Sequence, residues 1–238
     1  MNIVVIGGSG GIGSALLRQI QSRYPQATIF ATYHESEAKK DLSSNTKTHW
    51  SQLDVTSEES IRSYAMQFDK VNWLISAVGF LHHRRNLPEK SIEQVDPDFF
   101  LRNLQVNALS ALLIAKHFKR SLEHNDLALL AVISAKVGSI EDNRLGGWHS
   151  YRCSKAALNM AIKNISIEWR RSMPNVCVTA LHPGTTDTNL SLPFQRNVPQ
   201  GKLFTPDYTA ECLVNLLSQM QSSDSGRFLA YDGTHLPW

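Results

Sequence analysis

The chain has few cysteines, no long apolar run and no large excess of either charge. Its 238 residues include only three cysteines, Cys153, Cys177 and Cys212, which are scattered and form no CxxC pair. A reducing compartment is therefore expected, and a disulfide framework is not. No apolar run is long enough to span a membrane, and the opening MNIVVIGG lacks the charged start of a signal peptide. We expect a soluble cytoplasmic protein without a membrane partner.

The charge and the histidines exclude two further classes of site. The formal net charge is +3, and no basic helix or aromatic-rich basic stripe accompanies it. Nucleic acid is therefore not an expected partner. Nine histidines are present without an HExxH pattern, so no metal site is expected.

Short β-branched runs alternate with longer stretches of helical period along the whole chain. We expect strands at 2–6, 27–33, 47–53, 71–76, 127–134, 175–181 and 227–231. We expect helices near 11–23, 57–68, 97–123, 150–172 and 206–221. Strands that are continuously apolar are typical of a sheet covered on both faces, and strand–helix alternation indicates parallel order. The pattern predicts one α/β domain, residues 1–238, with a doubly wound parallel sheet of about seven strands.

A glycine cluster follows the first expected strand. Gly7, Gly11 and Gly13 have the spacing GxxxGxG in IGGSGGIGSALL. Glycine permits a tight turn and a close approach of the backbone to a pyrophosphate, and the next helix offers free N–H groups to that anion. A flexible strand–helix turn is the alternative, but the order strand, glycine loop, amphipathic helix favours a dinucleotide site.

A tyrosine and a lysine lie one turn apart on the helix expected near 150–172. Tyr151 and Lys155 share a face at positions i and i+4. A free phenol is a poor acid–base catalyst near neutrality, and a nearby ammonium is expected to lower its pKa from the ordinary value of about 10. A half-buried tyrosine beside a snorkelling lysine is the alternative for this pair alone.

Taken together, the glycine loop, this YxxxK pair and a Pro-Gly turn at Pro183 and Gly184 resemble the motifs of the short-chain dehydrogenase/reductase family. The resemblance spans essentially the whole chain. The segments VGSIEDNRLGGWHSYRCSKAALNM and YDGTHLPW are similar to its C-factor-like branch, bacterial relatives of small carbonyl reductases. The resemblance implies a Rossmann-type fold, an NAD(P) cofactor and a carbonyl or secondary-alcohol substrate. It also implies a homodimer or homotetramer.

The resemblance assigns a cofactor site residue by residue. Tyr33 occupies the position where an aspartate selects NAD, and His34 the position where NADP enzymes often carry arginine, which favours NADP; Glu35 nearby could reverse this. Asp54 would meet the adenine ring, although it could equally cap a helix. The implied cofactor-binding residues are Gly7, Ser9, Gly10, Gly11, Ile12, Gly13, Tyr33, His34, Asp54, Val55, Ala77, Gly79, Tyr151, Lys155, Pro183, Gly184, Thr186 and Thr188. Ile6 departs from the family, which usually has threonine before the first glycine.

The catalytic set is incomplete. By resemblance, Tyr151 is the acid–base residue, Lys155 also holds the ribose, and Asn107 interrupts its helix and binds a water that links to the lysine. The family's catalytic serine position holds Ala135. Ser134 or the nearby Ser139 could supply the hydroxyl, the enzyme could work more slowly without it, or catalysis could be lost. The last option corresponds to a low-turnover dinucleotide-binding regulator or a C-factor-like signalling protein.

The segment 189–205 corresponds to the family's mobile substrate loop. Its apolar residues could cover a carbonyl compound, and the alternative is a solvated surface loop. These residues are Leu190, Leu192, Phe194, Leu203 and Phe204. Trp148 and His149 precede Tyr151 and could line the same cavity. Arg84 and Arg85 could attract an acidic substrate, although a solvated basic turn is favoured.

Overall fold

A parallel sheet of seven strands forms the centre of the molecule in the computed structural model, which describes residues 1–35, 48–83 and 86–238. Arg84 and Arg85 lie outside the described residues. The strand order is β3-β2-β1-β4-β5-β6-β9, and every pairing is parallel. The strands are β1 Asn2–Ile6, β2 Thr28–Tyr33, β3 Thr48–Gln52, β4 Trp73–Ser76, β5 Ala128–Ile133, β6 Val176–His182 and β9 Phe228–Ala230. The predicted doubly wound parallel sheet is confirmed.

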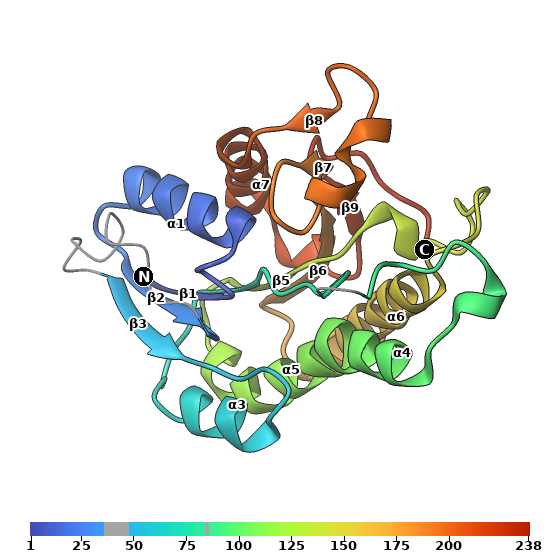
Figure 1. Cartoon of the computed structure of the whole chain (residues 1–238). Coiled ribbons are helices and arrows are strands. Elements are labelled where there is room, and N and C mark those ends of the chain that lie inside the picture. Colours follow the sequence, from blue (N-terminus) through green and yellow to red (C-terminus); the bar gives the residue numbers. More distant parts are fainter. Residues whose placement is uncertain (36–47, 84–85) are drawn as a thin grey trace.

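Helices cover both faces of the sheet (Figure 1). One face carries α1 Gly11–Arg23 and α7 Pro206–Gln219. The other carries α3 Glu58–Ala65, α4 Pro97–Leu104, α5 Ser110–Leu122 and α6 His149–Ser172. Alternate residues of one strand enter the two cores: Ile3 and Val5 pack on the α1–α7 side, whereas Val4 and Ile6 pack on the α3–α5–α6 side. Burial on both faces explains why these strands are continuously apolar.

Polar side chains cap the starts of two helices. Asp96 Oδ1 accepts a hydrogen bond from the Phe99 amide at 2.7 Å, with Pro97 as the first residue of α4. Ser57 Oγ accepts a hydrogen bond from the Ser60 amide at 3.2 Å and caps the start of α3. Each cap satisfies an amide that has no partner within its own helix.

Two features of the chain differ from a plain strand–helix alternation. The helix expected over 97–123 is divided by a π-helical turn at Gln105–Leu109, which contains Asn107. A second, two-stranded sheet pairs β7 Thr185–Thr186 with β8 Leu203–Phe204. Strands of two residues are too short for an apolar period, so the sequence carried no signal for them. Short 3₁₀ turns complete the described chain at Ile92–Gln94, Lys136–Gly138, Leu192–Asn197 and Ser222–Asp224.

The strand order places a crevice above β1 and β4. The chain runs outward in opposite directions from these two neighbours, and in such sheets ligands bind beyond the carboxyl ends of the strands at this switch. None of the helices in the described ranges is both long and apolar enough to cross a membrane.

Candidate active site

The glycine turn joins β1 to α1 at the crevice. Gly7 has φ +81°, and its carbonyl accepts from the Gly10 amide at 3.1 Å. A Cβ on Gly11 would lie 2.5 Å from Thr188 Cγ2, so the turn packs directly against the segment that follows β6. The first turn of α1 contains no acidic side chain, and no side chain caps its start. Its free N–H groups and backbone therefore fit a pyrophosphate.

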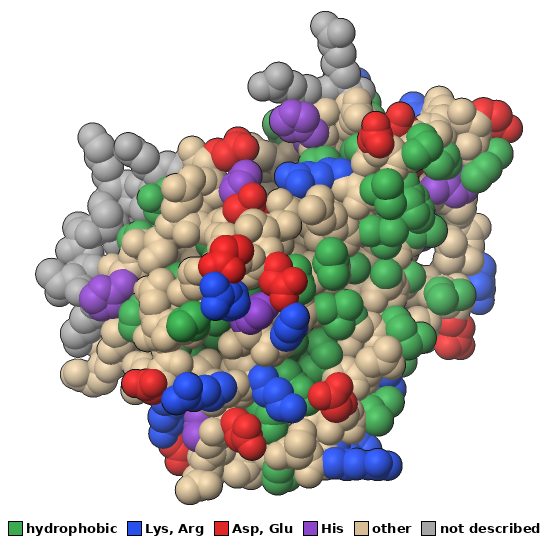
Figure 2. Space-filling view, turned by 90° about the horizontal axis from the view of Figure 1, so that it is seen from below, with side chains coloured by type: hydrophobic (Ala, Val, Ile, Leu, Met, Phe, Trp, Pro, Cys, Tyr) green, Lys and Arg blue, Asp and Glu red, His purple; other side chains and the backbone are tan. Residues whose placement is uncertain are grey.

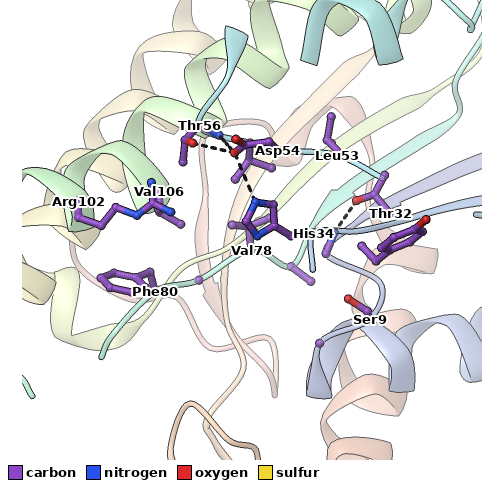
Figure 3. A pocket seen from close by; sticks show the side chains of 16 residues that line it. Ser9, Thr32, His34, Leu53, Asp54, Thr56, Val78, Phe80, Arg102 and Val106 are labelled. Atoms are coloured by element: carbon purple, nitrogen blue, oxygen red, sulfur yellow. Dashed lines mark hydrogen bonds and ion pairs between the residues drawn. The ribbon is translucent and has the colours of Figure 1, made fainter. Parts of the chain in front are cut away.

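Thr32 supports this turn from β2. Its Oγ1 accepts a hydrogen bond from the Gly7 amide at 3.0 Å, and the side chain is buried (Figure 3). Ile6 stands where the family usually has a threonine hydroxyl before the first glycine. Thr32, 25 positions after Gly7, supplies a hydroxyl to this turn instead.

Replacing Thr32 by valine is expected to lower the free energy of unfolding by about 1–3 kcal/mol, because the buried Gly7 amide loses its acceptor. Thr32→Ser keeps the hydroxyl and is the matched control. Urea unfolding of both variants measures the difference. Equal stability of the valine and serine variants would show that the Gly7 amide needs no acceptor.

A cavity of about 280 Å³ opens beyond the glycine turn. We call it the β1–β4 cavity, and its lining residues are Gly7, Ser9, Gly10, Thr32, Tyr33, His34, Leu53, Asp54, Val55, Thr56, Ala77, Val78, Gly79, Phe80, Arg102 and Val106. Asp54 Oδ1 accepts from the amide and the hydroxyl of Thr56 at 2.8 and 2.7 Å. These hydrogen bonds hold the pKa of Asp54 below its ordinary value.

Two basic side chains from different elements line the β1–β4 cavity. His34 follows β2, and its Nε2 lies 3.9 Å from Asp54 Oδ1. Arg102 belongs to α4, which no local pattern connects with β2 (Figure 3). Glu35 is exposed, with one carboxylate oxygen 3.5 Å from His34 Nδ1.

A larger cavity of about 570 Å³ lies over the ends of β5 and β6. We call it the β5–β6 cavity, and its lining residues are Ile12, Leu81, Leu87, Pro88, Lys90, Ala135, Lys136, Val137, Leu145, Trp148, Tyr151, His182, Pro183, Gly184, Thr185, Thr186, Thr188, Leu190, Ser191, Phe194, Asn197, Val198 and Pro199. The rings of Trp148 and Phe194 pack with centroids 4.7 Å apart. Most of the lining is apolar, which suits an uncharged organic molecule.

Tyr151 and Lys155 both lie buried at the start of α6. Lys155 Nζ donates to the Ile133 carbonyl at 3.0 Å and lies 5.8 Å from the centre of the Tyr151 ring. Gly138 lets the chain after β5 pack directly on this helix, because a Cβ there would lie 2.7 Å from Lys155 Cβ. Tyr151 itself lines the β5–β6 cavity.

The pKa of Tyr151 moves opposite to the sequence-based expectation. Burial raises the pKa of the phenol, because a charged phenolate would lose its water. Burial also lowers the pKa of Lys155 to about 8. Burial is the dominant effect on this phenol, so the expected lowering of the Tyr151 pKa is not found and Tyr151 keeps its proton near neutrality.

Asn107 joins three segments from its π-helical turn. Its Oδ1 accepts from the Phe80 amide at 2.8 Å, and its Nδ2 donates to the Phe80 carbonyl at 2.7 Å and to Ser154 Oγ at 2.9 Å. The wider turn places the amide between the segment after β4 and helix α6. The expected interruption of the helix is present. Asn107 connects Phe80, after β4, with Ser154 on α6.

Ser134 and Ser139 are directed to partners within the fold. Ser134 Oγ donates to Asn159 Oδ1 on α6 at 2.6 Å, and Ser139 Oγ donates to the Trp238 carbonyl at 3.3 Å. Neither lines the β5–β6 cavity, whereas Ala135 does. As the chain leaves β5, alternate side chains face opposite ways, which turns Ser134 toward α6. The structure therefore does not present Ser134 as the carbonyl donor that the sequence analysis considered.

Glu89 secures the start of α6 from a distant loop. Its buried carboxylate accepts from the Ser150 amide at 3.1 Å and from the Ser150 hydroxyl. Its carbonyl accepts from the Trp148 amide at 2.5 Å, and Trp148 has the left-handed φ of +51°. Nothing local to α6 caps it, so no sequence signal identified Glu89.

Glu89→Gln is expected to lower the free energy of unfolding by about 1–3 kcal/mol, because a charge-assisted bond to a helix start is lost. Carbonyl turnover is expected to fall as well, since Tyr151 follows Ser150 directly and a small misplacement of a reacting group costs up to about 100-fold. Glu93→Gln, at an exposed neighbouring carboxylate, is the control. Chemical unfolding and steady-state kinetics measure both effects. The prediction is wrong if the two variants behave alike.

The structure gathers the sequence-predicted residues into the two adjoining cavities. Gly7, Ser9, Gly10, Tyr33, His34, Asp54, Val55, Ala77 and Gly79 line the β1–β4 cavity. Ile12, Tyr151, Pro183, Gly184, Thr186 and Thr188 line the β5–β6 cavity. Gly11, Gly13, Lys155 and Asn107 support the walls from behind.

The substrate segment is only partly as expected. Leu190 and Phe194 line the β5–β6 cavity, together with Val198 and Pro199. Leu192 is exposed, and Phe204 packs against Tyr208 and Tyr231 instead. Sequence reasoning missed Thr32, Arg102, Glu89 and His182. Only His182, directly before the Pro-Gly turn, carried a local signal.

Comparison with known proteins adds a family and several relatives. Residues 1–198 match the family model described as short chain dehydrogenase. A 1-hydroxy-2-glutathionyl-2-methyl-3-butene dehydrogenase of Rhodococcus sp. is 29% identical over 99% of both chains. The C-signal of Myxococcus xanthus is 32% identical over 62% of this chain and 84% of its own. An NADPH-bound carbonyl reductase from chicken fatty liver superimposes with a TM-score of 0.86 at 25% identity, covering 100% of this chain and 94% of that one.

Proposed function

The chain belongs to the short chain dehydrogenase family and is an NAD(P)-dependent oxidoreductase, and from this premise we propose that it reduces carbonyl compounds with NADPH. The observation that carries the proposal is Tyr151, a buried phenol that keeps its proton and lines a largely apolar cavity beside the glycine turn. Trp148 and Phe194 favour an apolar or aromatic carbonyl compound. The low-turnover alternative is not favoured.

The chain's own residues account for proton delivery and orientation. The dinucleotide would lie across both cavities, its pyrophosphate at the start of α1, and would supply the hydride to the carbonyl carbon. Tyr151 donates its hydroxyl proton to the carbonyl oxygen, so that the product is an alcohol. The hydrogen bonds of Lys155 to Ile133 and of Asn107 to Phe80 fix the positions of helix α6 and of the segment after β4 around the Tyr151 hydroxyl.

NADPH is the proposed cofactor because two basic side chains face the ribose end. His34 and Arg102 both line the β1–β4 cavity, and no carboxylate occupies position 33. Fluorescence titration is expected to give a Kd for NADPH at least about tenfold below that for NADH, equivalent to about 1.4 kcal/mol. Arg102→Gln should weaken NADPH and leave NADH unchanged. Equal affinities for the two cofactors would overturn this choice.

Turnover tests the activity itself. NADPH oxidation by the purified chain is measured with a panel of aldehydes, ketones and quinones. Saturable turnover of at least one of them is expected. If NADPH binds and no member of the panel is reduced, the proposed activity is wrong and the protein is a dinucleotide-binding regulator.

The pH dependence of reduction is expected to follow Lys155. Its pKa of about 8 means that the ammonium is present at neutral pH and is lost as the pH rises through that value. The ratio kcat/KM for reduction should therefore fall above pH about 8. Lys155→Arg, which keeps its charge to higher pH, should move the fall upward. An unchanged profile in this variant would assign the fall to another group.

A homo-oligomer in the cytoplasm is also proposed. Large exposed apolar side chains lie on α4, the π-helical turn, α5 and α6, and Figure 2 shows apolar side chains gathered on the lower face of the molecule. These residues are Leu101, Leu109, Leu112, Met160 and Ile167. Contiguous apolar surface favours burial against a second copy. Sedimentation should give at least twice the 26.7 kDa chain mass.

A further inference from the structure

The reaction proposed for the β5–β6 cavity needs more than one donor to the carbonyl oxygen. Negative charge develops on that oxygen as hydride arrives, and enzymes place two hydrogen-bond donors around it. Tyr151 is one. The usual second, a serine hydroxyl, is replaced by Ala135, and the hydroxyls of Ser134 and Ser139 are bonded elsewhere in the fold.

His182 lies beside Ala135. Ile133 and Leu181 are partners in the β5–β6 ladder, so His182 is one step beyond that pair, at the end of β6. Its Nδ1 accepts a hydrogen bond from the amide of Lys136, the residue after Ala135, at 3.3 Å. Both Ala135 and His182 line the β5–β6 cavity. The strand register and this hydrogen bond place His182 beside the segment that carries Ala135, and His182 also borders a neighbouring cavity lined by Lys136 and Asp232.

The hydrogen bond at Nδ1 determines where the imidazole carries its proton. A nitrogen that accepts from a backbone N–H holds no proton, so the neutral ring is protonated at Nε2. No hydrogen bond from Nε2 is present within the described ranges of the chain. Burial lowers the pKa of His182 to about 4, with the Lys136 charge adding to this and Asp232 and Asp142 opposing it. The ring is thus a neutral donor across the neutral pH range.

We propose that the Nε2–H of His182 is the second hydrogen-bond donor to the substrate carbonyl oxygen, in place of the serine hydroxyl that this chain lacks. The inference rests on the proposed carbonyl reduction. His182 donates a hydrogen bond and transfers no proton, because the proton that completes the alcohol comes from Tyr151.

The test compares His182→Ala, Ala135→Ser and the double variant. His182→Ala is expected to lower kcat by about 100- to 1000-fold, the usual cost of one oxyanion donor. Its Kd for NADPH, measured by fluorescence, should stay at the wild-type value. Ala135→Ser alone is the reference for the double variant, because it adds the hydroxyl while His182 is still present. The double variant should have a kcat at least about tenfold above that of His182→Ala, because the new serine restores a donor at the same oxygen.

Two further measurements keep the outcome decisive. His182→Gln offers an amide oxygen to the Lys136 amide and an N–H to the cavity, so it should retain more activity than His182→Ala. It keeps the test usable when the alanine variant folds poorly. Nitrogen-15 NMR should report the Nε2–H tautomer and a shift of that nitrogen when a ketone inhibitor binds. Wild-type kcat in His182→Ala, or a serine that rescues nothing, overturns the inference alone. A wild-type chain that reduces no carbonyl compound overturns the proposed function as well.

Discussion

Replacing Tyr151 by phenylalanine is expected to lower kcat for carbonyl reduction by about 10²- to 10⁴-fold, the usual contribution of a positioned general acid. The substitution removes only the hydroxyl, so the ring keeps its contacts with Trp148 at the cavity wall. The Kd for NADPH and the free energy of unfolding should therefore remain close to wild type. Steady-state kinetics, fluorescence titration and urea unfolding measure the three quantities.

Tyr24→Phe is the matched control for this experiment. Tyr24 follows α1, packs edge-on against Trp73 and lines neither the β1–β4 nor the β5–β6 cavity. Its loss of one hydroxyl should leave kcat unchanged. Equal turnover by Tyr151→Phe and wild type would remove the phenol from the reaction. A parallel loss of NADPH affinity would assign it to cofactor binding instead.

Gly13→Ala is expected to abolish measurable NADPH binding and to destabilise the fold. A Cβ on Gly13 would lie 2.1 Å from the Gly7 carbonyl oxygen and 2.9 Å from the Gly7 carbonyl carbon. Both are backbone atoms of the turn that faces the pyrophosphate, so neither can rotate away. Overpacking of this kind costs about 1–3 kcal/mol of unfolding free energy, and a displaced turn no longer presents its amides to the cofactor.

Gly79→Ala is the steric control for Gly13→Ala. A Cβ there would meet only Leu190 Cδ1, at 3.7 Å, which is an ordinary contact. Its free energy of unfolding should stay within about 0.5 kcal/mol of wild type. If Gly13→Ala unfolds at the same urea concentration as Gly79→Ala, the glycine turn is looser than its geometry indicates.

The framework of this fold could be predicted from the sequence because its signals are local. A buried parallel strand must be apolar throughout, so 27–33 and 175–181 correspond to β2 and β6 to within one residue at each end. The cap at Asp96 and the glycine spacing are equally local. The same reasoning failed for β7 and β8, since two-residue strands have no period, and for the break in the helix over 97–123, which periodicity alone treated as continuous.

The direction of each side chain in the site depended on contacts between distant residues. Ser134 faces Asn159 on α6, Gly7 receives its acceptor from Thr32, Ser150 is held by Glu89, and Lys136 meets His182. The two partners of each pair lie on different elements of the chain. No window of sequence contains both members of such a pair, and a one-residue change in where a strand ends reverses which side chain enters the cavity.

The sequence by itself determined the sheet, the glycine turn and the Tyr151–Lys155 pair, because strand burial, a tight turn and helical spacing are properties of neighbouring residues. Only the tertiary structure decided that Tyr151 is buried, that Ser134 turns away and that His182 lies at the strand end beside Ala135. Desolvation and hydrogen bonding depend on what surrounds a group in space, and that surrounding forms only when strands and helices from the whole chain pack together.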